Sequence, residues 1–112
     1  MKQFDIVLVG LDPVVGREQS GTRPVLVISN DYENDLLNNI TVIPITSLKD
    51  GRKIYPNEYF LSKEVEKPSI LLCHQIRTIS KKRVIKYLSS IESLKKQKEI
   101  LDILCFRFEQ ME

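Results

Sequence analysis

The first two thirds of the chain consist of short apolar and β-branched runs, each closed by residues that favour turns. Runs of this kind predict strands. Between the second and third runs, Asn30-Asp31 is a cap signal for a short helical turn at Tyr32 to Leu37. Five or six strands spaced so closely predict a compact antiparallel sheet or a small barrel. The predicted strands are Phe4 to Leu11, Pro24 to Ser29, Ile40 to Thr46, Asn57 to Leu61, Ser69 to Cys73 and Gln75 to Ile79.

Near the end of the chain, the spacing of apolar residues is typical of a helix rather than of a strand. Apolar residues recur at helical spacing from Ile91 to Phe108, with Lys and Glu mostly between them. The segment Ser89-Ser90-Ile91-Glu92 matches a capping box. We therefore predict a helix of about five turns that packs on the sheet. Its apolar stripe is wide enough that one side could also serve a second subunit.

Composition and length limit the class of protein. The chain has 112 residues, of which 42% are hydrophobic and 29% charged, and this predicts one domain spanning residues 1–112. No apolar run approaches the roughly 20 residues that span a bilayer, so we expect no membrane association. The chain starts without the apolar core of a secretory signal, and we therefore expect it in the cytoplasm.

Cysteine and histidine are scarce. Cys73 and Cys105 stand among apolar residues, which predicts that both thiols are buried. The single histidine, His74, and the lack of a C-x-x-C pair predict no metal site, and nothing in the sequence indicates a cofactor. The net charge of +2 is too small to indicate nucleic acid by itself. Five basic residues and no acid lie between Arg77 and Lys86; they could attract a phosphate backbone, or they could form a solvated helix start.

A polar loop precedes the second predicted strand. Its charged and amide side chains lie between Gly16 and Gly21, which permit close approach of a partner, so the loop suits a polar ligand. Pro24 restricts Arg23 to extended backbone, and the guanidinium on this stiff element could hold a phosphate with two parallel N–H bonds. Pairing of Arg23 with Glu18 is the alternative interpretation.

Polar groups also interrupt the apolar runs at three predicted strand ends: Arg23, Thr46-Ser47 and the segment His74 to Arg77. Strand ends on a rigid scaffold often carry function. If the ligand is single-stranded RNA, His74 is the natural proton carrier, while Arg23 and Arg77 would stabilise the charge of the phosphorane. Thr46 would donate to a phosphate oxygen or orient the nucleophile. Two alternatives stay open: Thr46 and Ser47 could satisfy a turn, and His74 could be a surface imidazole bonded to a backbone carbonyl.

Four segments of this sequence, in order, resemble the MazF/PemK family of toxins. The resemblance extends from about Phe4 to the C-terminal helix, and its first block is long and specific. The segments are Leu11-Asp12-Pro13-Val14-Val15-Gly16, Glu18-Gln19-Ser20-Gly21-Thr22-Arg23-Pro24-Val25-Leu26-Val27-Ile28-Ser29-Asn30-Asp31, Ile45-Thr46-Ser47 and Gln75-Ile76-Arg77-Thr78-Ile79.

The resemblance implies a mainly β fold with flanking helices: an SH3-like, partly open β-barrel of the CcdB/MazF type with a C-terminal helix packed on the sheet. It also implies a homodimeric toxin of a type II toxin-antitoxin system. Such toxins are metal-independent, sequence-specific endoribonucleases (mRNA interferases) that cleave single-stranded mRNA to 2′,3′-cyclic phosphate and 5′-hydroxyl ends. The implied partner is a cognate MazE-like antitoxin. The alternatives are a gyrase-directed toxin on the same fold and a catalytically silent relative that binds RNA or antitoxin.

The resemblance also assigns roles to individual residues. Arg23 and Thr46 match the catalytic arginine and threonine of the family. His74 stands where members usually carry Asp or Glu, so an imidazole replaces a carboxylate in base recognition or proton transfer, and we include His74 among the expected catalytic residues. The residues matched to substrate binding are Arg17, Glu18, Gln19, Ser20, Ser47, Gln75 and Arg77.

Overall fold

The computed structural model describes residues 1–10 and 21–111, which form seven strands, two α-helices and two short 3-10 turns. All six predicted strands are present, with ends that differ by a few residues from the predicted ones. The predicted loop residues Arg17, Glu18, Gln19 and Ser20 lie outside the described residues. The elements are β1 (Asp5–Gly10), β2 (Thr22–Val27), α1 (Asp31–Leu36), β3 (Asn39–Ser47), β4 (Glu58–Leu61), β5 (Ser69–Leu72), η1 (Cys73–Gln75), β6 (Arg77–Ser80), η2 (Lys81–Arg83), β7 (Val84–Ser90) and α2 (Leu94–Arg107).

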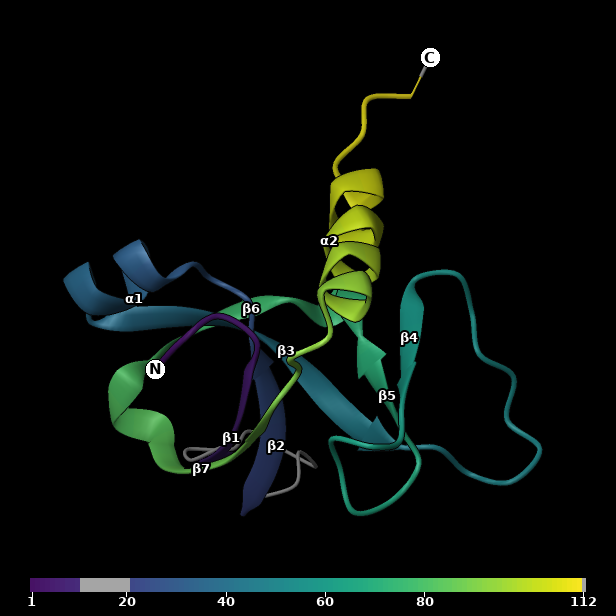
Figure 1. Ribbon diagram of the computed structural model, residues 1–112, viewed down its shortest axis with the longest axis horizontal. Helices are drawn as coiled ribbons and strands as arrows, with labels where there is room; N and C mark the ends of the chain where they lie inside the picture. The colour runs from purple at the N-terminus through teal and green to yellow at the C-terminus, as the bar shows by residue number, and fades with distance from the viewer. Residues whose placement is uncertain (11–20, 112) are drawn as a thin grey trace, which may run out of the picture.

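The strands form one antiparallel sheet in the order β4-β5-β3-β2-β1-β7, and β6 also pairs with β3. Along one edge of β3, β6 pairs with residues 39–42 and β5 with residues 45–47, and η1 lies between them. Within the described ranges, β4 and β7 end the path and do not pair with each other, so the sheet is not closed (Figure 1). This arrangement confirms the predicted mainly β fold with a partly open barrel.

Alternation along the strands divides the core into two clusters. In β2, Leu26 belongs to a large cluster that reaches α2, whereas Val25 and Val27 belong to a smaller cluster. Successive side chains of a strand point to opposite faces, so these clusters lie on opposite faces of the sheet. The smaller cluster consists only of β-branched residues, which pack well on a pleated surface.

Helix α2 packs on the sheet as predicted, but it starts later and is shorter than expected. Its 14 residues begin after Ser93, whose Oγ accepts a hydrogen bond from the Lys96 amide. The expected cap residues are occupied elsewhere: Ser89 Oγ donates to the Glu64 carbonyl at 2.6 Å, and Ser90 Oγ donates to Asp5 Oδ1 at 2.8 Å. Both serines therefore belong to β7, and the prediction of a capping box there is wrong.

Only one side of α2 enters the core. Ile100 and Leu104 are buried against the large cluster, whereas Leu94 is 79% exposed and Phe108 is 72% exposed. Figure 1 shows α2 rising from the sheet with the C-terminus beyond its outer end. Cys105 is exposed, so the prediction that it is buried is wrong; Cys73 is buried as predicted. Among the described helices, none has the length and apolarity needed to cross a bilayer.

The sequence prediction missed strand β7. It pairs with β1 through two register shifts, and its central residues are exposed. The basic segment Arg77 to Lys86 therefore runs through β6, η2 and β7, and its interpretation as a helix start is wrong. The short helix α1 is confirmed, and Asn30 caps it by accepting a hydrogen bond from the Glu33 amide at 2.9 Å.

Candidate functional site

Strand alternation sets Arg23 and Thr46 on the same face of the sheet. The pairing of β2 with β3 ends at Val25 and Pro44, and Arg23 and Thr46 each lie two residues beyond that pair. Residues opposite one another in such a pair extend to the same face. Both residues are half-buried. The structure therefore places a guanidinium and a hydroxyl on one face, at the ends of neighbouring strands.

Thr46 opens into a hollow of about 720 Å³. Four of the predicted site residues line it: Thr46, Ser47, His74 and Gln75. The remaining wall comes from the connection between β3 and β4, together with Leu72 of β5. The described lining is Thr46, Ser47, Lys49, Arg52, Tyr55, Pro56, Asn57, Glu58, Leu72, His74 and Gln75. We call this space the polar hollow.

His74 lies in η1, where a short 3-10 turn interrupts the chain between β5 and β6. Its Nδ1 is buried and has no hydrogen-bond partner among the described residues, and its Nε2 lies 3.4 Å from Gln75 Nε2. No hydrogen bond from the ring to a backbone carbonyl occurs within residues 1–10 and 21–111, so the bonded surface imidazole proposed as an alternative is not found. The ring is half-buried in the wall of the polar hollow.

Arg77 and the basic residues that follow it in η2 and β7 lie outside the described lining of the polar hollow. Arg77 pairs with Val42 in β3 and is exposed. Val42 and Thr46 are four residues apart in β3, so they share a face and lie about 13 Å apart. Neither Arg77 nor Arg23 belongs to the described lining of the polar hollow. They flank it along the sheet.

An ion pair between exposed Arg52 and buried Glu58, which sequence reasoning missed, holds the wall of the polar hollow. Arg52 Nη1 and Nη2 donate to the two carboxylate oxygens of Glu58 at 2.9 and 2.7 Å, and the Tyr55 amide donates to Glu58 Oε1 at 2.9 Å. Gly51, at φ +75°, reverses the chain just before Arg52. Only 3% of the Glu58 side chain is exposed. The hydrogen bonds from Arg52 lower the pKa of Glu58 to about 2, against the opposing effect of its burial.

This ion pair fixes the geometry of the connection. A two-bond guanidinium-carboxylate contact has a defined geometry and restrains both partners. It closes the segment 53–57 into a loop just after Gly51, and the same connection contributes Lys49, Tyr55 and Asn57 to the polar hollow. Within the described residues, no group of three His, Cys, Asp or Glu side chains could hold a metal ion. The chemistry available here is hydrogen bonding, positive charge and one imidazole.

Comparisons with known proteins give a consistent result. Residues 2–105 match the profile of the family described as PemK-like, MazF-like toxin of type II toxin-antitoxin system. The chain is 37% identical over 103 residues to the Endoribonuclease MazF of Staphylococcus saprophyticus, covering 89% of this chain and 84% of that protein.

Solved structures show the same fold. MazF from Deinococcus radiodurans (Form-I) superposes with a TM-score of 0.75 at 24% identity, covering 96% of this chain and 94% of that one. The MazE-MazF structure (Form-II) from the same organism gives a TM-score of 0.76 at 23% identity and covers 97% of each chain.

Proposed function

Because the chain belongs to the PemK-like, MazF-like toxins of type II toxin-antitoxin systems and is accordingly an endoribonuclease, we propose that it cuts single-stranded mRNA at short specific sequences without a metal ion. The observation that supports this proposal is that alternation along β2 and β3 sets Arg23 and Thr46 on the same face of the sheet, and that Thr46 lines the polar hollow. A guanidinium and a hydroxyl on one face supply the donors that a developing phosphorane requires.

The proposed reaction is an internal transfer at phosphorus. The 2′-oxygen attacks the adjacent phosphorus while its proton leaves, and the bond to the 5′-oxygen breaks as that oxygen gains a proton. The products are a 2′,3′-cyclic phosphate and a 5′-hydroxyl, so no water enters this step. Arg23 and Thr46 donate to the phosphorane oxygens, and His74 carries the proton.

Substrate binding is proposed for residues around the same space. Ser47 and Gln75 line the polar hollow with Thr46, and Arg77 lies further along the same face of the sheet. These side chains can hydrogen-bond unstacked bases or phosphates of a single strand. Arg17, Glu18, Gln19 and Ser20 are proposed to contact the substrate on the basis of the family resemblance.

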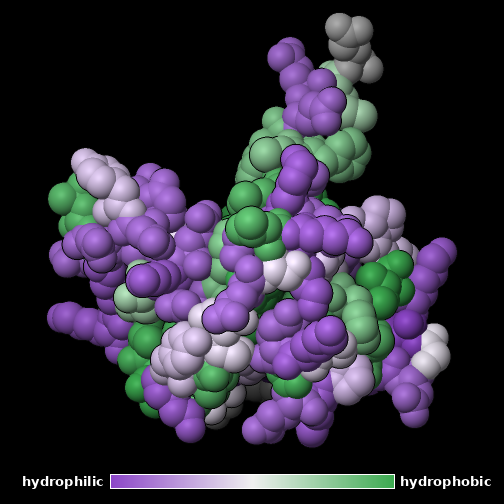
Figure 2. Space-filling view, in the orientation of Figure 1, coloured by the Kyte–Doolittle hydropathy of each residue, from purple (hydrophilic) through white to green (hydrophobic). Residues whose placement is uncertain are grey.

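We also propose a homodimer, a cognate MazE-like antitoxin and a cytoplasmic location, where the mRNA substrate is found. Apolar side chains of α2 that face solvent in one chain support a contact with a second subunit. Figure 2 shows apolar surface over the outer part of α2, above a body that is mostly hydrophilic on this face. The exposed apolar residues of the helix and the segment after it are Leu94, Leu101, Phe106, Phe108 and Met111.

The products test the proposed reaction. A sequence-diverse single-stranded RNA is incubated with the purified protein in EDTA, and the fragments are labelled by a polynucleotide kinase without prior phosphatase treatment. Direct labelling at discrete positions is expected, because only 5′-hydroxyl ends accept the phosphate. Fragments that label only after phosphatase treatment carry 5′-phosphates and would contradict the mechanism. Intact RNA would favour a silent relative or a gyrase-directed toxin.

A further inference from the structure

Tyr55 brings an aromatic ring to the polar hollow. It is 52% exposed, and it is the only Phe, Tyr or Trp residue in the described lining of this hollow. Within residues 1–10 and 21–111, Tyr55 forms its hydrogen bonds through the backbone, and its hydroxyl has no partner. A tyrosine that serves the fold usually buries its ring and bonds its hydroxyl. The exposed ring therefore has no evident structural task and is open to a ligand.

The backbone of Tyr55 is held on both sides by Glu58. The Tyr55 amide donates to Glu58 Oε1 at 2.9 Å, and the Tyr55 carbonyl accepts a hydrogen bond from the Glu58 amide at 2.9 Å. Pro56 follows directly and disfavours helical backbone at Tyr55. Arg52, which pairs with Glu58, also donates from Nη1 to the Lys53 carbonyl at 2.9 Å. The ion pair thus fixes the segment that carries Lys53 and Tyr55, so this segment would lose little conformational entropy on binding a ligand.

Two lysines near the ring carry positive charge that no described acid compensates. Lys49 lines the polar hollow, and the Lys53 ammonium lies 5.8 Å from the centroid of the Tyr55 ring. Neither lysine forms an ion pair within the described residues, whereas Glu58 compensates the charge of Arg52. An aromatic face beside unpaired cations is the combination that holds single-stranded nucleic acid, because bases stack on the ring and phosphates pair with the cations.

We propose that Tyr55 is the platform on which one base of the RNA substrate stacks, and that Lys53 contacts the phosphate beside that base. This inference rests on the proposed function and adds the residues that position the strand. Tyr55 and Thr46 line the same hollow, so the stacked base holds a neighbouring phosphate close to Thr46. Stacking acts equally in the ground state and in the transition state, so it lowers KM and leaves kcat nearly unchanged.

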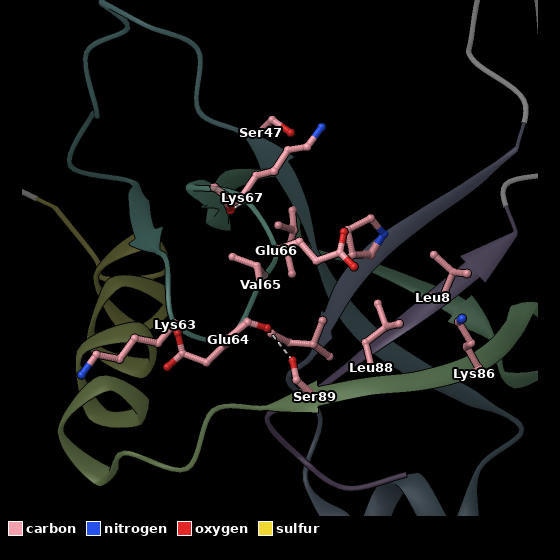
Figure 3. Close-up of a pocket in the computed structure, with 14 residues that line it drawn as sticks. Leu8, Ser47, Lys63, Glu64, Val65, Glu66, Lys67, Lys86, Leu88 and Ser89 are labelled. Carbon is pink, nitrogen blue, oxygen red and sulfur yellow. Dashed lines mark hydrogen bonds between the residues drawn. The ribbon is translucent and has the colours of Figure 1, made fainter.

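A second hollow in the described structure lacks such a platform. It measures about 590 Å³ and lies between β7 and the connection from β4 to β5 (Figure 3). Its described lining includes Leu8, Val65 and Leu88 and contains no aromatic or arginine side chain. A base would find no planar group to stack on there. The two hollows therefore differ in the feature that the proposal requires.

The first test measures RNA binding without cleavage. The probe is a fluorescein-labelled RNA of mixed sequence with every ribose 2′-O-methylated, so that no 2′-hydroxyl can attack. Tyr55→Ala should weaken binding by about 5- to 150-fold, the range that loss of one stacked base produces, whereas Tyr55→Phe should bind within about twofold of the wild type. Tyr32→Ala is the matched control, because Tyr32 lies on α1 and is 74% exposed. It should change the affinity by less than about twofold.

Two further readouts separate stacking from charge. The chain contains no tryptophan, so Tyr55→Trp introduces a single indole whose fluorescence reports stacking. The methylated RNA should quench this fluorescence and leave that of the control Tyr32→Trp unchanged. Lys53→Gln should reduce the slope of log affinity against log salt concentration by about 0.7, because one phosphate contact is lost. Lys2→Gln, at an exposed position near the N-terminus, should leave the slope unchanged.

The inference is overturned if the wild type does not bind the methylated RNA, or if Tyr55→Ala binds it as tightly as the wild type. It is also overturned if Tyr55→Phe binds as weakly as Tyr55→Ala, since the hydroxyl would then be responsible. A smaller mass of Tyr55→Ala in solution would assign the ring to a contact with a second copy of the chain instead. If the binding results are as expected but the wild type cuts no RNA, only the proposed endoribonuclease function is contradicted.

Discussion

Ile45 and Thr46 are neighbours in β3, yet they line two different hollows. Ile45 is 4% exposed, belongs to the large core cluster and contributes to the floor of a second hollow, which lies between β7 and the connection from β4 to β5. Thr46 is half-buried and opens into the polar hollow on the other face. One step along the strand therefore separates an apolar side chain in the core from a polar one in the candidate site. The comparison teaches that alternation along one strand gives its two faces different chemistry, although the next residue, Ser47, borders both hollows.

A substitution in the polar hollow should have the largest effect on activity. His74→Gln should slow RNA cleavage by about 1000-fold, because a positioned proton carrier typically contributes 100- to 10,000-fold. Single-turnover cleavage rates of the wild type and the variant measure the effect. A variant that cleaves as fast as the wild type would show that His74 is not the proton carrier.

Thr46→Val should slow cleavage by about 100-fold, since one donor to the developing charge is lost while the side chain keeps its shape. The melting temperature should stay close to that of the wild type. Thr41→Val is the matched control: Thr41 is also half-buried in β3, and its hydroxyl lies 3.4 Å from the Thr78 hydroxyl. Equal cleavage by both variants would show that the face of Thr46 carries no chemistry.

Ile45→Ala should have the opposite effect: it should lower stability and leave cleavage largely intact. Removing this buried side chain should lower the free energy of unfolding by about 2–5 kcal/mol, because a cavity forms in the large core cluster. Cleavage per folded molecule should change by less than about tenfold. Urea denaturation and cleavage assays on the same preparation measure the two effects. A stable but inactive Ile45→Ala protein would contradict the assignment of stability to one face of β3 and of activity to the other.

Replacing Glu58 should have a smaller effect on stability, and this effect should depend on pH. Its pKa of about 2 in the folded protein lies below the ordinary carboxyl value, so its contribution is fully present above that ordinary value and is lost as pH falls toward 2. Glu58→Gln should therefore lower the melting temperature at pH 7, and the difference from wild type should shrink as pH is lowered from 6 to 3. Glu109→Gln, at an exposed position, serves as the control. A difference that stays constant with pH would show that the ion pair with Arg52 is not the source.

The sequence predicted the strands whose pattern reflects burial. Strand β7 was missed because its central residues, from Ile85 to Leu88, are exposed on both faces and give no alternation. The start of α2 was misplaced because Ser89 and Ser90 bond to groups distant in sequence, which a local capping pattern does not include.

The sequence also predicted part of the candidate site. Two of the three predicted strand ends contribute Thr46, Ser47, His74 and Gln75 to the polar hollow, since polar residues that interrupt apolar runs mark the ends of strands. Arg23 and Arg77 lie outside its described lining. The ion pair of Arg52 with Glu58 could not be predicted, because it depends on the path of a turn between two strands. The hollow between β7 and the connection from β4 to β5 was missed because β7 itself was not predicted.

The most direct test of the account is metal-free cleavage of a long, sequence-diverse single-stranded RNA in EDTA by the wild type and by Arg23→Ala. The account predicts discrete cuts by the wild type that share one short sequence, and a loss of at least about 100-fold in the variant, which lacks the guanidinium on the same face as Thr46. Equal cleavage by the two proteins, or none by the wild type, would contradict the assignment of chemistry to this face of the sheet.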